Sequence, residues 1–522
     1  MKNRSIIVTA LAFAIFGTSN SHAQNTHPLF EDRSATLPIE HVYEGGWEHF
    51  VGGGVAVFDC NNDDLPDFYA AGGESPARLF INKSTARGSL TFELGKQATE
   101  LTGVTGAYPI NVDGDEHTDL IVLRVGENFA LRGLGNCAFE RANEDWGFDG
   151  GNSWSTSFSA TWENGQNWPT MFVGNYVDRT NPEGPFEACD KNELHRPTGK
   201  RFDEPILIEP GFCALSALVS DELRVGRKEL RISNDRHYYV RGGSEQKLRL
   251  DTLEFLGPDD GWPTVALWGM GIAAQDITGD GRAEVMSTSM GDQLLQIATD
   301  DGFENAPYSI GTYAQKPFLG DDGRPSTGWH AQFGDVDNNG LVDLFIAKGN
   351  VDQMPSNAIK DPNNLLVQSG DGTFMERAME AKVATTDRSR GAALADLNND
   401  GLLDLIVMNR RAPLELYENV TKGSGNWLTL NLTGDKNNVN AIGSFIEVRT
   451  DEKLHTREIT IGGGHAGGQL LPQHFGLGGI SEAHVRITAP DGSVASSWTL
   501  VPANARCGFS FDKGQMSCSP TM

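Results

Sequence analysis

The chain lacks long apolar runs. Beyond its first residues, no stretch of its 522 residues approaches the roughly 18 apolar residues that a membrane-spanning helix needs. Basic residues are also scarce, because 42 Lys and Arg stand against 70 Asp and Glu, giving a formal net charge of -28 at pH 7. A chain this acidic is repelled by nucleic acid and by anionic membrane surfaces. We therefore expect neither a membrane span nor a nucleic-acid partner.

The common signatures of catalytic sites are also missing. The sequence contains no G-x-S-x-G elbow, no phosphate-binding loop and no dinucleotide fingerprint. Its histidines, among them His330, His465, His474 and His484, show no spacing typical of a catalytic zinc site. These absences favour a binding protein over an enzyme, and they identify no catalytic or cofactor-binding residue.

The first residues are typical of a secretory signal peptide covering 1–23. Lys2 and Arg4 precede an apolar run at 6–16, and a small-residue segment ends at Ala23. No Cys follows the predicted cleavage site after Ala23 to accept a lipid. We therefore expect a secreted, periplasmic or cell-surface protein.

The chain has only six cysteines, and in an exported protein these favour disulfides. Six cysteines allow fifteen pairings, but neighbours in sequence are the expected partners. The predicted pairs are Cys189–Cys213 and Cys507–Cys518, which leave Cys60–Cys137.

A nine-residue acidic motif is present five times. Side chains that carry oxygen recur at its positions 1, 3, 5 and 9, which suits a hard cation such as Ca²⁺, and a Gly at position 6 permits a sharp turn. An apolar segment follows each copy, and Ile346 stands where an EF-hand would need Glu, so a strand context is expected instead. The predicted calcium ligands are Asp59, Asn61, Asp63, Leu65 and Asp67; Asn111, Asp113, Asp115, His117 and Asp119; Asp276, Thr278, Asp280, Arg282 and Glu284; Asp335, Asp337, Asn339, Leu341 and Asp343; and Asp396, Asn398, Asp400, Leu403 and Asp404.

The five copies are not equivalent. Asp64 and Glu116 replace the turn Gly, and Asn111 lacks the charge that Asp supplies at position 1. We therefore expect the first two loops to bind calcium more weakly than the last two.

The spacing of the motif predicts the fold. Adjacent copies begin roughly 50 to 60 residues apart, which is the period of propeller blades, and each is followed by a second hairpin that would complete a four-stranded blade. A degenerate copy lies at 162–170, and the segment from Val177 to Glu229 is either an insertion or a further blade without a metal loop. Six blades are visible by hairpin count; we expect seven, within a range of six to eight.

The chain resembles the FG-GAP/VCBS class of calcium-loop propellers. Its C-terminal segments Asn440–Ser444, Gly462–Gly464 and His474–Gly478 resemble the ASPIC/UnbV domain. A propeller followed by that domain is the layout of the cartilage acidic protein family, here in a bacterial-type secreted member. The resemblance implies an all-β protein with a propeller at 24–420, an insertion near 177–229 and an ASPIC/UnbV-like domain at 421–522. Alternation of apolar and polar residues in this last part independently predicts a small β-sandwich.

These features favour an exported calcium-binding interaction or cell-adhesion protein that binds an extracellular or surface protein or a glycan. One alternative is a polysaccharide-active propeller enzyme, a lyase or glycosidase; another is a periplasmic assembly factor. The enzyme would use an aromatic platform beside Glu144, Asp145 and Glu163. Packing is the favoured role for these aromatics because two tryptophans precede their loops by the same eight residues. The candidate platform consists of Trp146, Trp154, Trp162 and Trp168.

Overall fold

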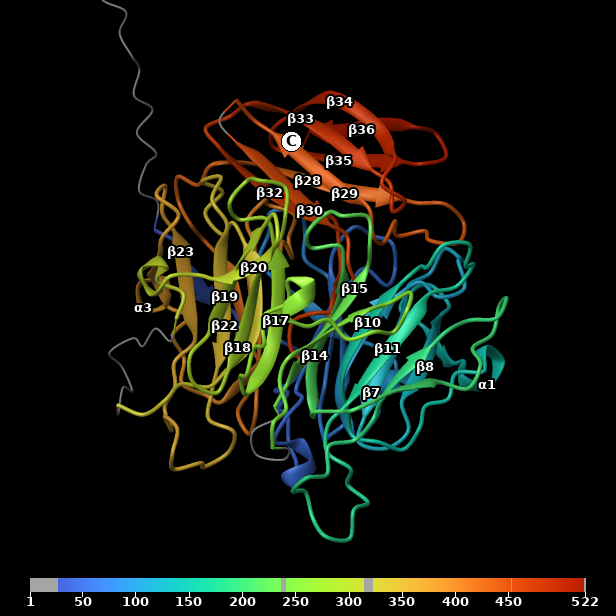
Figure 1. The fold of residues 1–522 in the computed structure, drawn as a ribbon. Helices are drawn as coiled ribbons and strands as arrows, with labels where there is room; N and C mark the ends of the chain where they lie inside the picture. The colour runs from blue at the N-terminus through green and yellow to red at the C-terminus, as the bar shows by residue number, and fades with distance from the viewer. Residues whose placement is uncertain (1–26, 236–240, 314–322, 452, 521–522) are drawn as a thin grey trace, which may run out of the picture.

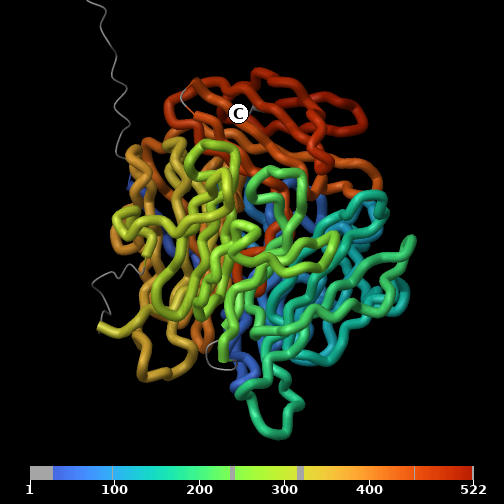
Figure 2. Tube along the Cα trace, viewed as in Figure 1, coloured from blue at the N-terminus to red at the C-terminus, as the bar shows by residue number. Residues whose placement is uncertain are grey.

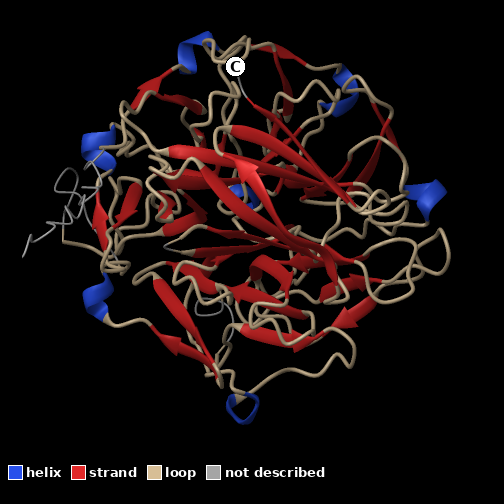
Figure 3. Ribbon diagram, turned by 90° about the horizontal axis from the view of Figure 1, so that it is seen from above, coloured by secondary structure: helices blue, strands red, loops and turns tan. Residues whose placement is uncertain are grey.

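We describe the protein from a computed structural model that covers residues 27–235, 241–313, 323–451 and 453–520. The predicted signal peptide lies outside these residues. Nine sheets make up the described part, and seven of them surround a common axis as blades. The remaining two form a C-terminal domain that lies on one end of the propeller (Figure 1). Viewed along the axis, the molecule has a round outline (Figure 3). The prediction of an all-β propeller followed by a β-sandwich is confirmed.

Each blade begins with a strand whose residues are almost all buried, because the innermost strands face one another around the axis. Successive strands pair antiparallel toward the outside. Blades 1 to 3 consist of β2 (Val55–Phe58), β3 (Asp67–Ala70), β4 (Arg78–Asn82) and β5 (Phe92–Leu94); β6 (Val104–Ile110), β7 (Asp119–Arg124), β8 (Phe129–Gly133) and β9 (Phe139–Arg141); and β10 (Ser155–Thr161), β11 (Thr170–Asn175), β12 (Asn192–His195) and β13 (Ile206–Ile208).

Blades 4 to 7 continue the ring, and the N-terminal strand completes it. Blade 7 takes its outermost strand from β1, which pairs with β27 at Phe30 and Asn419. The strands are β14 (Ala214–Ser220), β15 (Glu229–Asn234) and β16 (Gln246–Arg249); β17 (Gly269–Gln275), β18 (Glu284–Ser289), β19 (Leu294–Thr299) and β20 (Gly302–Asn305); β21 (Gly328–Gly334), β22 (Asp343–Lys348), β23 (Asn364–Gln368) and β24 (Phe374–Glu376); and β25 (Ser389–Ala395), β26 (Asp404–Asn409), β27 (Glu415–Asn419) and β1 (Phe30–Asp32).

Short helices occupy the connections. They are α1 (Asn143–Trp146) and α3 (Ala378–Ala381), with the 3-10 turns η1 (Ser34–Thr36), η2 (Trp47–His49), η3 (Gln97–Thr99), η4 (Pro258–Asp260) and η5 (Tyr308–Ile310).

The segment from Val177 to Glu229 is not an insertion. It contains β12 and β13, the outer strands of blade 3, and β14, the inner strand of blade 4. The sequence did not reveal this, because the turn between β10 and β11, at 162–170, lacks most of the acidic residues of the motif. Of the two alternatives, the further blade is therefore the correct one.

The C-terminal domain is a sandwich of two four-stranded sheets. One sheet has the order β32-β28-β35-β36 and the other β30-β29-β33-β34. Its strands are β28 (Asn426–Thr433), β29 (Phe445–Arg449), β30 (Leu454–Glu458), β32 (Gln473–Gly478), β33 (Glu482–Thr488), β34 (Val494–Pro502), β35 (Ala505–Ser510) and β36 (Gln515–Pro520).

A Gly-rich segment of this domain, residues 459–471, enters the centre of the propeller. We call it the channel segment. It forms bridges with the inner strands of blades 2 to 5, and its strand β31 (Gln469–Leu470) runs parallel to β2 of blade 1. His465, at its middle, is fully buried, and its backbone N–H donates to His330 Nδ1 of blade 6 at 3.0 Å. Figure 2 shows this C-terminal part of the chain between the blades.

Close approach of the channel segment requires glycine on the blades. A Cβ added to Gly54 or Gly106 would lie 1.8 Å or 1.7 Å from the carbonyl oxygen of Ala466. No side chain fits at either position, so the inner strands of blades 1 and 2 are shaped to receive this segment.

All three expected disulfides are present: Cys60–Cys137, Cys189–Cys213 and Cys507–Cys518. Complete pairing fits a protein that folds in an oxidising compartment outside the cytoplasm. Within the described residues, no helix has both the length and the apolar character required to cross a membrane.

Candidate functional site

The five acidic loops connect the first and second strands of blades 1, 2, 5, 6 and 7. They gather on the face of the propeller that carries the C-terminal domain, and hydrogen bonds to backbone carbonyls of two loops join the two parts. Gly478 N donates to Asn338 O at 2.8 Å, Gly425 N donates to Asp337 O at 3.0 Å, and His474 Nε2 donates to Gly401 O at 3.1 Å. The loops of blades 6 and 7 are therefore covered by the chain's own second domain.

The loops share a hydrogen-bond pattern that explains their spacing. In four of them the position 1 carboxylate accepts the N–H of position 6 at 2.7–2.9 Å. In all five, the position 5 carboxylate or amide oxygen accepts the N–H of position 7, also at 2.7–2.9 Å. The side-chain oxygens at positions 1 and 5 thus stabilise the turn by accepting backbone hydrogen bonds. The same oxygens keep further lone pairs that could bind a cation.

The position 9 carboxylate is a buried anchor in every loop. One of its oxygens accepts the N–H of position 2 at 2.8–3.0 Å. In four blades the other oxygen accepts a backbone N–H from the third strand at 2.8–3.0 Å. These residues are fully buried: Asp67, Asp119, Glu284, Asp343 and Asp404. They hold the turn and the blade together, whether or not they also bind metal.

Two positions of the turn, 4 and 6, adopt left-handed backbone conformations. Asn338 and Gly340 have φ of 58° and 84°, and the loop at 396 repeats this pair. The sequence analysis recognised only position 6. Asp64, at position 6 of the first loop, adopts φ 67°, a left-handed conformation that Asp tolerates at some cost. Glu116, at position 6 of the second loop, does not adopt a left-handed conformation. The missing Gly therefore changes the second loop more than the first.

The loop at 335–343 brings its three aspartates together. Asp335, Asp337 and Asp343 are buried, and an oxygen from each lies within 4.8 Å of those of the other two. Burial, together with repulsion from Asp337, raises the pKa of Asp335 well above its usual value. Burial and the charge of Asp335 do the same for Asp343. Three converging buried carboxylates need a counter-charge, and a divalent cation with oxygen ligands supplies one. The donor set therefore fits Ca²⁺.

The loop at 396–404 has the same architecture with one correction. Burial raises the pKa of Asp396 to about 7 and that of Asp404 well above its ordinary value. Position 7, where a backbone carbonyl would contribute, is Leu402 and not the predicted Leu403. The Leu403 carbonyl instead accepts from Asn419 Nδ2 at 3.0 Å, so it faces the neighbouring strand.

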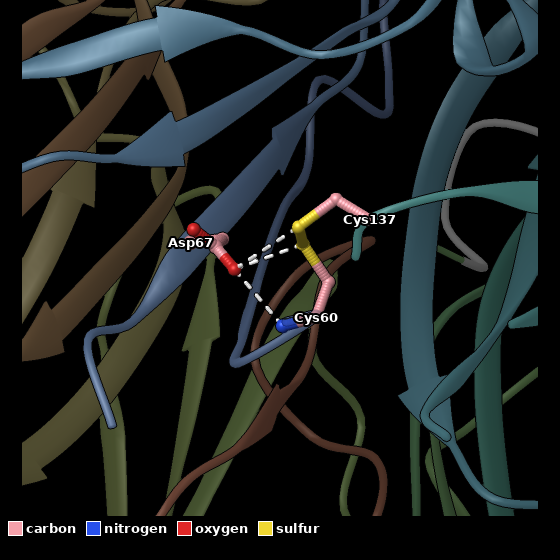
Figure 4. A group of neighbouring side chains, drawn as sticks. All are labelled: Cys60, Asp67 and Cys137. Atoms are coloured by element: carbon pink, nitrogen blue, oxygen red, sulfur yellow. Dashed lines mark hydrogen bonds between the residues drawn. A yellow bond between two sulfur atoms is a disulfide. The ribbon is translucent and has the colours of Figure 1, made fainter. Parts of the chain in front are cut away.

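The first loop, at 59–67, is more exposed. Asn61 Nδ2 donates to Asp63 Oδ2 at 2.9 Å, so two of the predicted ligands are hydrogen-bonded to each other. Asp67 lies beside the Cys60–Cys137 disulfide, with Oδ2 2.8 Å from Cys60 Sγ (Figure 4). These three residues form no metal site, because disulfide sulfurs are not thiolates. The disulfide instead ties this loop to blade 2.

In the second loop, at 111–119, a side chain of the loop hydrogen-bonds to the loop's own backbone carbonyls. Asn111 Nδ2 donates to Asp115 O and to His117 O, at 2.6 and 3.0 Å. The amide nitrogen thus lies against backbone oxygens that a cation would otherwise bind, including that of position 7. Asp113 pairs with Arg132 at 3.2 Å. The protein's own donors therefore lie at positions where a cation would bind.

The third predicted loop, at 276–284, is intermediate. Arg282, at position 7, forms an ion pair with Asp280 at position 5 and another with Asp300 at 2.7 Å. Burial raises the pKa of Asp276 to about 6 and that of Glu284 to about 7, as expected for acids without a full counter-charge. Thr278 Oγ1 lies 3.5 Å from Glu284. An internal cation therefore offsets part of this loop's charge.

Sequence reasoning missed a loop in blade 4, at 221–229. Asp221 Oδ2 accepts Gly226 N at 2.8 Å, and Arg224 and Gly226 are left-handed, as at positions 4 and 6 elsewhere. Leu223 and Val225 occupy the ligand positions 3 and 5, so the motif was not recognised. The spacing of Asp, Gly and Glu at positions 1, 6 and 9 was the available signal.

In blades 3 and 4, the acidic side chains at the turn between the first and second strands form ion pairs with Arg or Lys side chains. In blade 3, Arg196 Nε and Nη2 donate to Glu163 at 2.7 and 3.0 Å. In blade 4, Lys247 Nζ lies 2.8 Å from both Glu222 and Glu229. These blades therefore need no metal to balance the charge at their turns.

The alternative of an aromatic platform is not supported, because these side chains are not at the surface. The four tryptophans are at most 8% exposed and pack within the blades. Trp146 contacts Trp168 edge to face at a centroid distance of 5.7 Å, and Trp154 contacts Tyr176 at 4.8 Å. The predicted packing role is confirmed, and the alternative of a sugar-stacking surface is excluded because the rings are buried against other side chains.

Seven blades, five of them with an acidic turn between the first and second strands, and a β-sandwich whose Gly-rich segment enters the axis define a β-propeller with a C-terminal domain. Two family models match the chain: an FG-GAP-like repeat at residues 335–407, and ASPIC and UnbV at 434–515. These matches support an FG-GAP-like repeat followed by an ASPIC/UnbV domain in this chain.

Among curated proteins, the chain is similar to cartilage acidic protein 1. Identity with the Mus musculus protein is 28% over 154 residues, which cover 28% of this chain and 22% of that protein. Identity with the Xenopus tropicalis protein is 29% over 126 residues, covering 23% and 19%. The match thus spans about a fifth of the length of these relatives. That this chain is a bacterial-type member stays a prediction.

Solved structures give a more distant similarity. BBS1N in complex with ARL6DN has a TM-score of 0.44 at 9% identity and covers 76% of this chain and 98% of that one. A lectin from Agrocybe aegerita has a TM-score of 0.40 at 14% identity, covering 71% and 94%. The Dos1 propeller has a TM-score of 0.36 at 10% identity, covering 73% and 95%. All three scores are below 0.5, and the chain's own seven sheets define its fold.

Proposed function

We propose that this chain is an exported, calcium-stabilised scaffold that binds a protein partner through the propeller face opposite the C-terminal domain. The converging aspartates of the loop at 335–343 carry the calcium part of the proposal. Asp335, Asp337, Asn339 and Asp343, with the Leu341 carbonyl, would hold the cation in the loop nearest the domain contact. The bound cation supplies positive charge that offsets the cost of burying these acids.

The loop at 396–404 would form a second such site, and the other three loops would bind calcium more weakly to differing degrees. Asp280 and Asp113 already have guanidinium partners, and Asn111 already fills its own turn. Calcium is therefore proposed to act as a structural ion under the sandwich rather than at a ligand-binding surface.

The opposite face offers the surface for a partner. Its most prominent feature is the loop between β11 and β12, at 178–188, which projects below the propeller in Figure 1. Phe186, in this loop, is 68% exposed. The Cys189–Cys213 disulfide closes its base, and Arg179 Nε donates to Glu48 at 2.6 Å beside the partly exposed Trp47. An anchored loop that presents an aromatic side chain is a typical protein-contact feature.

The test uses arrays of extracellular proteins and of glycans, probed with the full mature chain in calcium. A variant with Gly-Ser residues at 180–187 should lose its protein ligand while keeping the wild-type melting temperature, because no blade strand is altered. Phe186→Ser should weaken the same interaction. Tyr308→Ser is the matched control, since Tyr308 is 74% exposed on a different blade and should change nothing.

Retained binding by the Gly-Ser variant would exclude this loop as the contact. Binding confined to glycans would replace the protein partner with a carbohydrate. A deletion of the whole segment 177–229 is unsuitable, because it would remove strands of two blades.

A further inference from the structure

We propose that the cavity between the C-terminal domain and the inner strands of the propeller binds a small hydroxylated carboxylate of sugar-acid size, with Arg457 as its anchor. The cavity has a volume of about 210 Å³. It is lined by the channel segment, by the strands β30 and β32 of the sandwich, and by the inner strands β17, β21 and β25 of blades 5 to 7. The site is separate from the partner-binding face at the other end of the propeller.

Arg457 is held at the wall of this cavity in a defined orientation. Its Nη2 donates to Gln275 Oε1 at 2.8 Å, and its guanidinium stacks 5.1 Å from the ring centre of Phe475. Its contact with Gln473 is long, 3.4 Å from Nη1 to Oε1. Burial lowers the pKa of Arg457 to about 10, so the side chain is still a cation at neutral pH. Neutral amides therefore orient the guanidinium without neutralising it.

Arg457 has no paired acid. Among the described residues, no carboxylate lies within ion-pair distance of it, and Asp335 acts on it only from farther away. Its Nε is buried and has no hydrogen-bond partner in that part of the chain. A buried cation with an unsatisfied donor is costly, and a carboxylate ligand would supply both the charge and the acceptor.

His474 supplies the complementary polar group. Burial lowers the pKa of its imidazole to about 4, so the ring is neutral at pH 7. Its Nε2 donates to the Gly401 carbonyl, which leaves Nδ1 as an acceptor without a partner in the described chain. A hydroxyl group is the donor that such an acceptor needs. The same wall thus offers a cation for a carboxylate and an acceptor for a hydroxyl.

Two acids, Asp396 and Glu458, also line the cavity, and Arg506 at the same wall acts on Asp396 as a counter-charge. Glu458 follows Arg457 on the strand and accepts the Asp221 N–H at 2.9 Å, and burial raises its pKa to about 8. Its charge is therefore reduced relative to an exposed Glu, and Lys228 acts on it as a counter-charge. Arg506 also lines the cavity and adds a second cation. A volume of 210 Å³ is below that of sites for drug-sized ligands and fits a monosaccharide acid.

The test is a calorimetric and saturation-transfer NMR titration of the full mature chain with galacturonate. We expect a Kd of about 1 mM or tighter, as small polar ligands give. Neutral methyl galactoside should not bind. A trigalacturonate arm distinguishes the source, because binding of the trimer alone would assign the site to a polysaccharide end rather than a free sugar acid.

Arg457→Gln should weaken galacturonate binding by at least about 10-fold, the value of a charged hydrogen bond. Arg449→Gln is the matched control, because Arg449 lies on the adjacent strand β29 and stacks on Trp498 instead. Gln473→Glu would place an internal carboxylate beside Arg457, so it should abolish binding while raising the melting temperature. No binding of either uronate by wild type, equal binding of the neutral sugar, or unchanged binding by Arg457→Gln would overturn the proposal.

Discussion

The contact between Gly106 and the channel segment gives a sharp test of the domain arrangement. In Gly106→Ala the new Cβ would start 1.7 Å from the Ala466 carbonyl oxygen, whereas ordinary contact begins near 3.4 Å. The obstacle is backbone, so no side-chain rotation relieves it. The channel segment must move by roughly 1.7 Å, the difference between these two distances.

That movement carries a cost that can be estimated. Overpacking alone costs about 1–3 kcal/mol. Gly463 N and Gly464 N donate to Ala217 O and Ile272 O at 2.7 and 2.6 Å, and displacing these bonds adds about 1 kcal/mol each. We therefore expect Gly106→Ala to lower the free energy of unfolding by about 3–5 kcal/mol in total.

Urea unfolding measures this loss, and hydrogen exchange followed by mass spectrometry locates it at 459–471. Gly370→Ala is the control, because a Cβ there meets no atom within 4 Å. If Gly106→Ala were as stable as Gly370→Ala, with unchanged exchange in the channel segment, the placement of this segment on the propeller axis would be refuted.

Three other predictions concern charge. Burial raises the pKa of Glu415 from 4.5 to about 7, so its contribution to stability is fully present below pH 4.5 and is lost as pH rises from there through 7; Glu415→Gln should unfold at higher urea than wild type at pH 8, by up to about 2 kcal/mol, and at nearly the same urea at about pH 4. In calorimetric calcium titrations, Asp337→Ala should lose more affinity than Asp115→Ala, because the Asn111 amide already fills the second loop; equal losses would contradict this ranking. Arg196→Gln should lower stability by about 1 kcal/mol in urea, equally with calcium or chelator, since Glu163 loses a partly exposed protein cation and not a metal.

The blade repeat was predictable from sequence because its acidic residues have a backbone role. The position 9 carboxylate, as in Asp343, bridges the turn and the third strand in hydrogen bonds of fixed geometry. Such a role fixes the spacing along the chain, and the spacing is visible without any structure. The turn at 221–229 shows the limit, because Leu223 and Val225 removed the ligand pattern while Asp221 and Gly226 kept the fold.

The covering of the loops was not predictable. Nothing in the sequence near Gly401 or Asn338 signals that His474 and Gly478 will dock on them. Likewise, a Gly-rich run such as Gly462–Gly464 has no side chains that would indicate a partner. These contacts join residues far apart in the chain, and their complementarity exists only in the folded molecule.

The role of calcium can be tested most directly by thermal unfolding of the mature chain in excess calcium and in chelator. Each site held at about 100 times its Kd adds about 2.7 kcal/mol if the unfolded chain does not bind. We expect a clear drop in melting temperature in chelator for wild type, and a much smaller drop for Asp337→Asn combined with Asp400→Asn. Identical melting curves of the wild-type protein in calcium and in chelator would contradict the proposed structural role of the ion.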